Sequence, residues 1–189
     1  MVVPLKDSVH QLVRYTDRLT LVAATADHLR AELADPEQLA TLLQAQIPPG
    51  WPPGEYDADA QKVFLHSLID GGDGSVGWYG WYALCREATY GSSMLIGTGG
   101  FLGPPDRDGQ IELGYSVHPH WQNRGYATEL VGELLSFAFG DTRVTSIVAH
   151  TARDNIASCR VLEKLGFGAC TCLEQSAVEY RLTWDRLPA

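Results

Sequence analysis

The sequence has no excess of positive charge and no long apolar segment. Its 14 Lys and Arg residues are outnumbered by 23 Asp and Glu residues, which gives a net charge of -9. A nucleic-acid-binding surface needs a basic footprint, so this balance argues against such a partner. No apolar run approaches the roughly 18 residues of a membrane span, and the first residues lack the apolar core of a signal peptide. We therefore expect a cytoplasmic protein without nucleic-acid or membrane partners, whose acidity favours a cationic or amine substrate.

Cysteine is scarce, and its spacing does not fit metal binding or redox chemistry. The four cysteines (Cys85, Cys159, Cys170 and Cys172) form no C-x-x-C pair, and no histidine pair has the spacing of zinc ligands. We expect free thiols in a reducing cytosol, and no metal site. The chain also lacks the G-K-[ST] sequence of a P-loop, which leaves a nucleotide-binding protein of that type as a distant alternative.

One stretch joins a predicted strand to a predicted helix through a turn that contains glycine. Residues 111–117 alternate like a strand, and Pro119 ends it because proline has no amide hydrogen for a sheet. Residues 127–139 have the three-four apolar spacing of a helix with one buried face. The turn at 122–127 places a glycine before the first amides of that helix, which lack partners and lie at its positive end. Such a turn accepts a phosphate or pyrophosphate, so the sequence predicts a phosphorylated ligand here.

The rest of the chain predicts one domain, residues 17–189, after a flexible N-terminal arm of residues 1–16. Further strands are indicated by alternating or β-branched segments at 18–23, 77–84, 94–101, 144–150, 170–176 and 178–184. Further helices are indicated by caps and apolar spacing at 25–33, 35–43, 59–69 and 154–166. Because a strand, a helix and a strand follow in series from residue 111, strands 111–117 and 144–150 are expected to be parallel neighbours.

Two motifs occur in a characteristic order. The turn reads Q-N-R-G-Y-A at residues 122–127, and residues 154–167 form the second motif. The first resembles the Q/R-x-x-G-x-G/A signature of the GNAT superfamily of acyl-CoA-dependent N-acetyltransferases, and the second resembles that superfamily's following helix. Residues 17–21 and 161–167 are most similar to the RimJ/RimL-like branch, which acetylates protein N-termini. The resemblance implies an α/β (α+β) fold with a mixed, centrally splayed sheet of six to seven strands flanked by four to five helices.

The resemblance implies acetyl-CoA as cosubstrate, bound where two parallel strands splay apart, and no metal. The backbone of Tyr115, Ser116 and Val117 is then expected to pair with the pantetheine amides like an added strand. Asn155 is expected to hydrogen-bond the pantetheine arm as well as to cap its helix. The residues expected to hold the pyrophosphate are Gln122, Asn123, Arg124, Gly125, Tyr126, Ala127 and Thr128. Either Arg124 or Arg160 meets the adenosine phosphates, or both are solvated surface charges.

The resemblance also implies which groups move protons. Glu112 matches the glutamate of the RimL-like strand and is the first candidate for the base or a water-mediated relay; its alternative is a salt-bridged edge residue. His150 stands where some relatives carry a catalytic carboxylate, and its ordinary pKa suits proton transfer near neutrality. Many relatives protonate the leaving thiolate with a tyrosine at the position of Leu162, which has no proton to give, so Ser158 is the candidate donor. Oxyanion stabilisation is expected from the backbone amide of Val117.

The acceptor is the part that the sequence defines least. The resemblance implies a primary amine, on a protein N-terminus or a small molecule, and leaves a homodimer and a monomer open as the assembly. An acyl-CoA-binding module with little or no turnover is the alternative function, because the tyrosine of the second motif is missing. Five aromatic residues line the acceptor mouth in one interpretation and belong to the core in the other: Trp51, Tyr56, Trp78, Trp81 and Tyr82.

Overall fold

The strands of the protein form one mixed sheet in a computed structural model that describes residues 11–54, 56–86, 92–170 and 177–183. Over these residues the order across the sheet is β1-β2-β3-β4-β5-β6-β8-β7. β5 and β6 pair in parallel, whereas the other neighbouring strands pair antiparallel. The strands are β1 (Val13–Tyr15), β2 (Leu19–Ala23), β3 (Gly80–Cys85), β4 (Met94–Phe101), β5 (Gln110–Val117), β6 (Ser146–Ala152), β7 (Gly168–Ala169) and β8 (Ala177–Thr183).

The helices begin at polar residues that satisfy their first amides. The Thr25 side chain accepts from the amide of His28 at the start of α1, and Asp35 accepts from the amide of Glu37 at the start of α2. Asp57 caps the next helix in the same way. In the described part of the chain the α-helices are α1 (Ala26–Ala34), α2 (Pro36–Leu43), α3 (Ala58–Gly71), α4 (Tyr126–Phe139) and α5 (Ile156–Lys164), and the 3₁₀ turns are η1 (Gly72–Ser75) and η3 (Pro119–Trp121).

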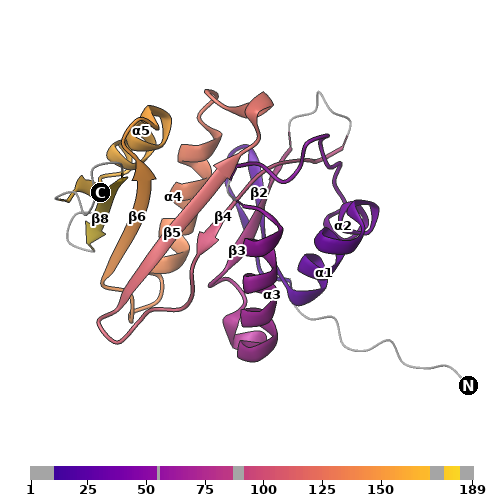
Figure 1. The fold of residues 1–189 in the computed structure, drawn as a ribbon, viewed down its shortest axis with the longest axis horizontal. Coiled ribbons are helices and arrows are strands. Elements are labelled where there is room, and N and C mark those ends of the chain that lie inside the picture. Colours follow the sequence, from indigo (N-terminus) through magenta and orange to yellow (C-terminus); the bar gives the residue numbers. More distant parts are fainter. Residues whose placement is uncertain (1–10, 55, 87–91, 171–176, 184–189) are drawn as a thin grey trace, which may run out of the picture.

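Apolar side chains form a core on each face of the sheet. On one face α1, α2 and α3 pack through residues such as Leu29 and Leu68 against Tyr82 of β3. On the other face α4 packs through residues such as Leu134 against Trp81 of β3 and against the strands of the second half of the sheet. Figure 1 shows α3 in front of the sheet and α4 behind it. The two cores hold the sheet between the helices, and β5 and β6 are neighbours in the middle of the strand order.

The parallel pair separates part-way along its length. β5 and β6 are hydrogen-bonded neighbours only as far as Glu112 and Val148 over the described residues. Beyond this point β5 continues to Val117 beside β4, and β6 continues to Ala152 beside β8. Figure 1 shows the two strands diverging toward their C-terminal ends. The sheet therefore opens into a fork, which is the splayed centre that the sequence predicted.

The predicted α/β fold with a mixed, splayed sheet is confirmed, with differences at the edges. The described sheet has one strand more than the predicted upper limit of seven, because Val13–Tyr15 pair with β2 as β1. These residues lie in the segment expected to be an arm. β6 is shifted by two residues from the predicted strand 144–150, so His150 lies inside it. The predicted strand 170–176 falls mostly outside the described residues, and the short β7 precedes it.

The start of α4 is tied to β2 by a carboxylate. Glu129 accepts hydrogen bonds from the Thr16 hydroxyl (2.5 Å), the Arg18 amide (2.8 Å) and the Arg18 guanidinium (2.7 Å). Arg18 also donates to the carbonyl of Arg124 (3.0 Å), in the turn before α4. Burial acts to raise the pKa of Glu129, but the bonds from Thr16 and Arg18 outweigh it and lower the pKa below its ordinary value. The carboxylate form is therefore stabilised by folding.

Glu129→Gln should lower the free energy of unfolding by about 1–3 kcal/mol at pH 7, because several charge-assisted hydrogen bonds are lost together. A carboxyl group whose pKa is lowered by folding stabilises the protein above its unfolded pKa near 4.5, and this contribution is lost as the pH falls through the folded pKa. The difference from wild type should therefore shrink in denaturant titrations at about pH 3. Glu133→Gln, on the same helix with one ion pair to Arg14, is the matched control and should cost under about 1 kcal/mol.

Candidate active site

On the β5 side of the fork, every second residue points its backbone N–H and C=O groups into the fork. The amide of His118 donates to the carbonyl of Ile96 on β4 (2.8 Å), which fixes the alternation of the antiparallel pair. Tyr115 and Val117 consequently direct their N–H and C=O groups away from β4 and into the fork. Ser116 directs its backbone groups toward β4, so its predicted backbone pairing with a cofactor does not fit this register. Its side chain instead contributes to the lining of the fork.

The turn after β5 is shaped by two residues in left-handed conformation. Asn123 has φ 60° and Gly125 has φ 83°, a region that asparagine tolerates and glycine adopts freely. The side chain of Gln122 donates from Nε2 to the carbonyl of Val117 (2.9 Å), which ties the turn back to the strand. The turn is thus held close to the end of β5, with its glycine just before α4.

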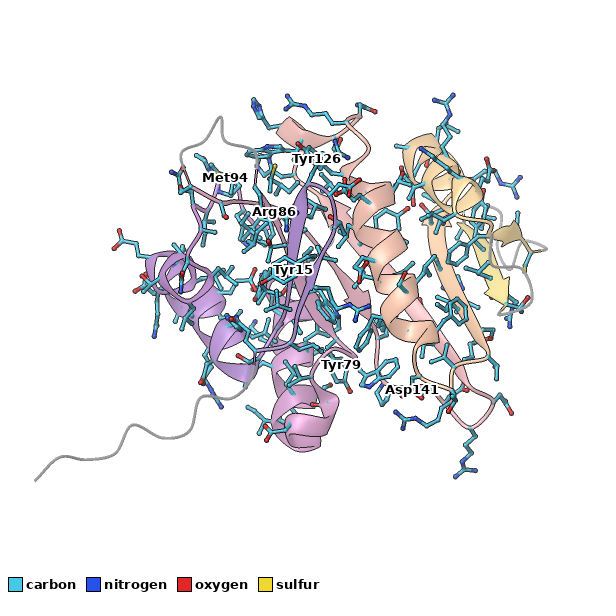
Figure 2. The ribbon with its side chains drawn as sticks, turned by 180° about the vertical axis from the view of Figure 1, so that it is seen from behind. Tyr15, Tyr79, Arg86, Met94, Tyr126 and Asp141 are labelled. Atoms are coloured by element: carbon cyan, nitrogen blue, oxygen red, sulfur yellow. The ribbon has the colours of Figure 1, made fainter. Side chains whose placement is uncertain are left out.

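Helix α4 begins without a side-chain cap. Its N-cap residue is Gly125, so the N-cap offers no side chain to hydrogen-bond the first amides of the helix, those of Tyr126, Ala127 and Thr128. The Tyr126 ring is buried, with the Arg18 guanidinium 4.3 Å from its centroid. Figure 2 shows Tyr126 near the upper end of α4, where the helix starts. Tyr126 therefore anchors the helix through its side chain, while the first-turn backbone remains suited to an anionic group.

The other side of the fork is formed by β6 and the start of α5. Asn155 is the N-cap of α5 and accepts from the amide of Ser158 (3.1 Å), and both residues line the fork. The Tyr115 hydroxyl lies 2.9 Å from Ser158 Oγ and donates to the Ser158 carbonyl at 3.2 Å. Burial raises the pKa of Tyr115, so its phenol stays protonated near neutrality. Leu162 lies one turn further along α5 and is fully buried.

A cavity of ≈ 410 Å³ runs from the fork toward α3. Asn155, Ser158 and His150 line it at the fork, and Tyr56 and Phe64 line it at the far end. Four glycines form part of its wall: Gly54, Gly99, Gly100 and Gly114. The elements predicted to bind the cofactor and the aromatic residues Tyr56 and Phe64 therefore line the same cavity.

The two candidate bases lie in contact with each other. The Glu112 carboxylate is 2.9 Å from Nδ1 of His150, and each side chain is 39% exposed. His150 Nε2 lies 3.5 Å from Glu179 on β8, and Glu179 in turn pairs with Arg181 at 3.0 Å. The pKa of Glu179 is lowered by the Arg181 hydrogen bond first and by His150 to a lesser degree. Of the two candidates, His150 is the one whose side chain reaches the cavity lining.

A partly buried carboxylate that sequence reasoning missed lies behind the far end of the cavity. Glu32 of α1 accepts from the Trp51 indole N–H (2.6 Å), the Tyr56 hydroxyl (2.9 Å) and the Tyr82 hydroxyl (2.6 Å). Burial raises the pKa of Glu32, and the three donated bonds act in the opposite direction. Trp51 and Tyr56 belong to the loop between α2 and α3. This loop is also close to β5, because a Cβ on Gly54 would lie 2.7 Å from the Ser116 hydroxyl. Glu32 thus fixes the loop that covers this end of β5.

The aromatic residues proposed for the acceptor mouth divide between the cavity and the core. Tyr56 lines the cavity, whereas Trp78 and Trp81 are buried in the core beside Phe137 of α4. Tyr82 is fully buried and reaches Glu32. The mouth interpretation is therefore wrong for Trp78 and Trp81, because alternation along β3 sends Trp81 to the α4 face of the sheet.

The fold and the fork define an acyl-CoA-dependent transferase, and comparison with known proteins identifies the family. Residues 18–168 match the model of the acetyltransferase (GNAT) domain. The chain therefore belongs to the GNAT acetyltransferases, in the RimL-like family. It is an N-acetyltransferase that uses acetyl-CoA, as the sequence motifs predicted.

Relatives of known sequence or structure cover nearly the whole chain. An uncharacterised N-acetyltransferase, YjdG of Bacillus subtilis, is 28% identical over 166 residues, which are 88% of this chain and 93% of that protein. RimL, a ribosomal L7/L12 α-N-protein acetyltransferase solved with coenzyme A, has a TM-score of 0.65 at 16% identity, over 93% of this chain and 99% of that one. An acetyltransferase of Agrobacterium tumefaciens has a TM-score of 0.59 at 24% identity, over 96% and 99%. At these identities the structural matches establish the common fold.

Metal and membrane features are not found in the described part of the chain. No cluster of three or more His, Cys, Asp or Glu side chains is arranged for a metal ion there. None of the described helices combines the length and the apolar character of a membrane span. The cysteines described, Cys85, Cys159 and Cys170, are free thiols, and Cys172 lies outside the described residues.

Proposed function

We propose that this enzyme transfers the acetyl group directly to a primary amine, with cosubstrate and acceptor bound together. The observation that carries the proposal is the single cavity that joins the fork, with Asn155 and Ser158, to an open space toward Tyr56. A thioester at the fork and an amine in that space would meet without any covalent enzyme intermediate. Direct attack in a ternary complex relies on orientation rather than on a nucleophilic side chain.

The residues present fit coenzyme A. The outward backbone groups of Tyr115 suit the pantetheine amides, as an added strand would, while the Val117 carbonyl already accepts from Gln122. The uncapped start of α4 after Gly125 suits the pyrophosphate. Asn155 combines the cap of α5 with a place in the cavity wall, which supports both of its predicted roles. Acetyl-CoA supplies an activated acyl group, and the protein supplies its placement.

The amine must lose a proton before it attacks. An α-amine has a pKa near 8, so deprotonation at pH 7 costs on the order of 1 kcal/mol, and a lysine-like amine costs roughly 4–5 kcal/mol. We assign proton removal to the Glu112–His150 pair, with Glu112 as the base acting through His150 or through water. The 2.9 Å contact between them and the position of His150 in the cavity wall support this assignment.

We assign protonation of the leaving thiolate to Ser158, which forms a hydrogen bond with Tyr115. Tyr115 has one hydroxyl proton, which reaches either the Ser158 carbonyl or Ser158 Oγ. In the arrangement that we assign to catalysis it is donated to Ser158 Oγ, and the serine hydroxyl proton is then directed into the cavity, toward a sulfur at the fork. Leu162 stands where many relatives have a proton-donating tyrosine, and it has no proton to give. In this proposal Ser158 and Tyr115 perform that proton transfer instead. The Val117 amide, which points into the fork, is assigned to the thioester carbonyl oxygen.

The acceptor proposed is the α-amine of a protein N-terminus, with small-molecule amines as the second class. RimL, which shares the fold, is named as an α-N-protein acetyltransferase. Thiol release from acetyl-CoA should accelerate when peptides with free N-termini are added, and mass spectrometry should find the acetyl group on the peptide. An acyl-CoA-binding module is the alternative: it would bind acetyl-CoA in calorimetry and leave every peptide and amine unmodified.

A further inference from the structure

The described lining of the acceptor half of the cavity consists mostly of apolar and uncharged polar residues. Among the described residues that line it none is Lys or Arg, and the titratable ones are Tyr56, Tyr115 and His150. Of the residues outside the description, 55, 87–91 and 171–176 contain no Lys or Arg, whereas the two terminal segments contain Lys6 and Arg186. An acceptor carboxylate that entered this space would lose water without meeting a lysine or arginine among the described lining residues.

Carboxylates lie directly behind that lining. Glu32 contacts Tyr56 (2.9 Å), and Glu112 contacts His150 (2.9 Å) from the other side. Glu179 also approaches His150, but its charge is shared with Arg181. The Trp51, Tyr56 and Tyr82 groups that donate to Glu32 are uncharged, so they hydrogen-bond its charge but do not neutralise it. The groups around the acceptor space therefore favour a cation and oppose an anion.

We propose that the acceptor site selects primary amines that carry no carboxylate near the nitrogen, and rejects free amino acids. The proposal rests on the proposed amine acetylation and names its substrate class. A peptide N-terminus meets this requirement because its first carboxyl group is in an amide bond, and so does an alkyl amine. Rejection arises from repulsion and from the loss of hydration of the carboxylate, both of which act against the wrong acceptor.

The test uses acceptor pairs that differ in a carboxylate. Butylamine and 4-aminobutyrate have amines of similar basicity, and alaninamide and alanine are compared at equal concentrations of neutral amine. In each pair kcat/KM should favour the acceptor without the carboxylate by at least about tenfold. Equal use of both members of each pair by the wild type would overturn the proposal while leaving amine acetylation intact. If no amine were acetylated by enzyme that binds acetyl-CoA, the proposed function and this inference would both fail.

Two variants test the cause. Leu102→Arg places a cation in the cavity wall at a residue that is 56% exposed, so the protein should tolerate it. It should raise kcat/KM for 4-aminobutyrate, so that the ratio of kcat/KM for butylamine to that for 4-aminobutyrate falls by about tenfold. Glu32→Gln should lower this kcat/KM ratio by a smaller factor and leave the affinity for acetyl-CoA unchanged. Glu133→Gln, which is remote from the cavity lining, should keep the wild-type ratio. An unchanged ratio in both Leu102→Arg and Glu32→Gln would show that charge does not set the selectivity.

Discussion

Glu112→Gln should lower kcat by about 10²–10³-fold, because general base catalysis commonly contributes 10²–10⁴-fold and part of it can be supplied by water. Glutamine keeps the size of the side chain and can still contact His150, but it cannot take up a proton. The affinity for acetyl-CoA should stay within about twofold of wild type, because Glu112 is not a lining residue of the fork. Stopped-flow or steady-state thiol release, together with calorimetric binding of acetyl-CoA, measures the two quantities separately.

The pH profile distinguishes a base from a structural partner of His150. If Glu112 and His150 move the proton together, the acidic limb of the kcat/KM profile should flatten in Glu112→Gln and in His150→Gln, and the double variant should be no worse than the more severe single one. Glu133→Gln should keep the wild-type profile. A Glu112→Gln enzyme with wild-type kcat would remove Glu112 from the mechanism. His150 or water would then be the base.

Gly100→Ala should destabilise the protein by at least about 3 kcal/mol, which is among the largest effects expected of a single methyl group. A Cβ at Gly100 would lie 1.6 Å from the carbonyl oxygen of Tyr79, a backbone atom that can move only if β3 and β4 separate. Urea or thermal unfolding should show a large loss of stability, or the variant should be found in the insoluble fraction.

Gly114→Ala is the matched control. Gly114 is the cross-strand partner of Gly100 and lines the same cavity, but a Cβ there meets no atom within 4 Å. Its stability should change by less than about 1 kcal/mol. The added methyl group enters the acceptor space, so KM for bulky amines should rise instead. Equal losses of stability in the two variants would contradict the steric explanation.

The sequence predicted the fold around the fork well because its signals are local. A strand that ends at a proline, a turn with Gly125 and a helix with a clear apolar face leave few alternatives for residues 111–139, and the fork appears where predicted. Asn155 and Ser158 lie at the start of the predicted second helix for the same reason, and their roles stay predictions. The side toward which each backbone group points could not be predicted, because it depends on the register with β4.

The acceptor half depends on contacts between distant segments, and here prediction failed in part. Glu32 meets Trp51, Tyr56 and Tyr82 across 19 to 50 residues of sequence. A lone Glu in an amphipathic helix looks like a solvated charge, and only the fold shows its three donors. The mouth and the core both stayed open for Trp81, because an aromatic strand offers no sign of which face is buried against α4.

The division of the cavity has a consequence for how the enzyme can diversify. The groups around the cofactor come from residues 112–158, whereas the covering loop, its anchor Glu32 and the α3 wall come from residues 32–64. Under the proposed function, mutations in residues 32–64 should change which amine is accepted without touching the groups proposed to hold coenzyme A. Much of the acceptor choice would then be inherited through a different stretch of the gene from cofactor affinity, and the two could be selected independently.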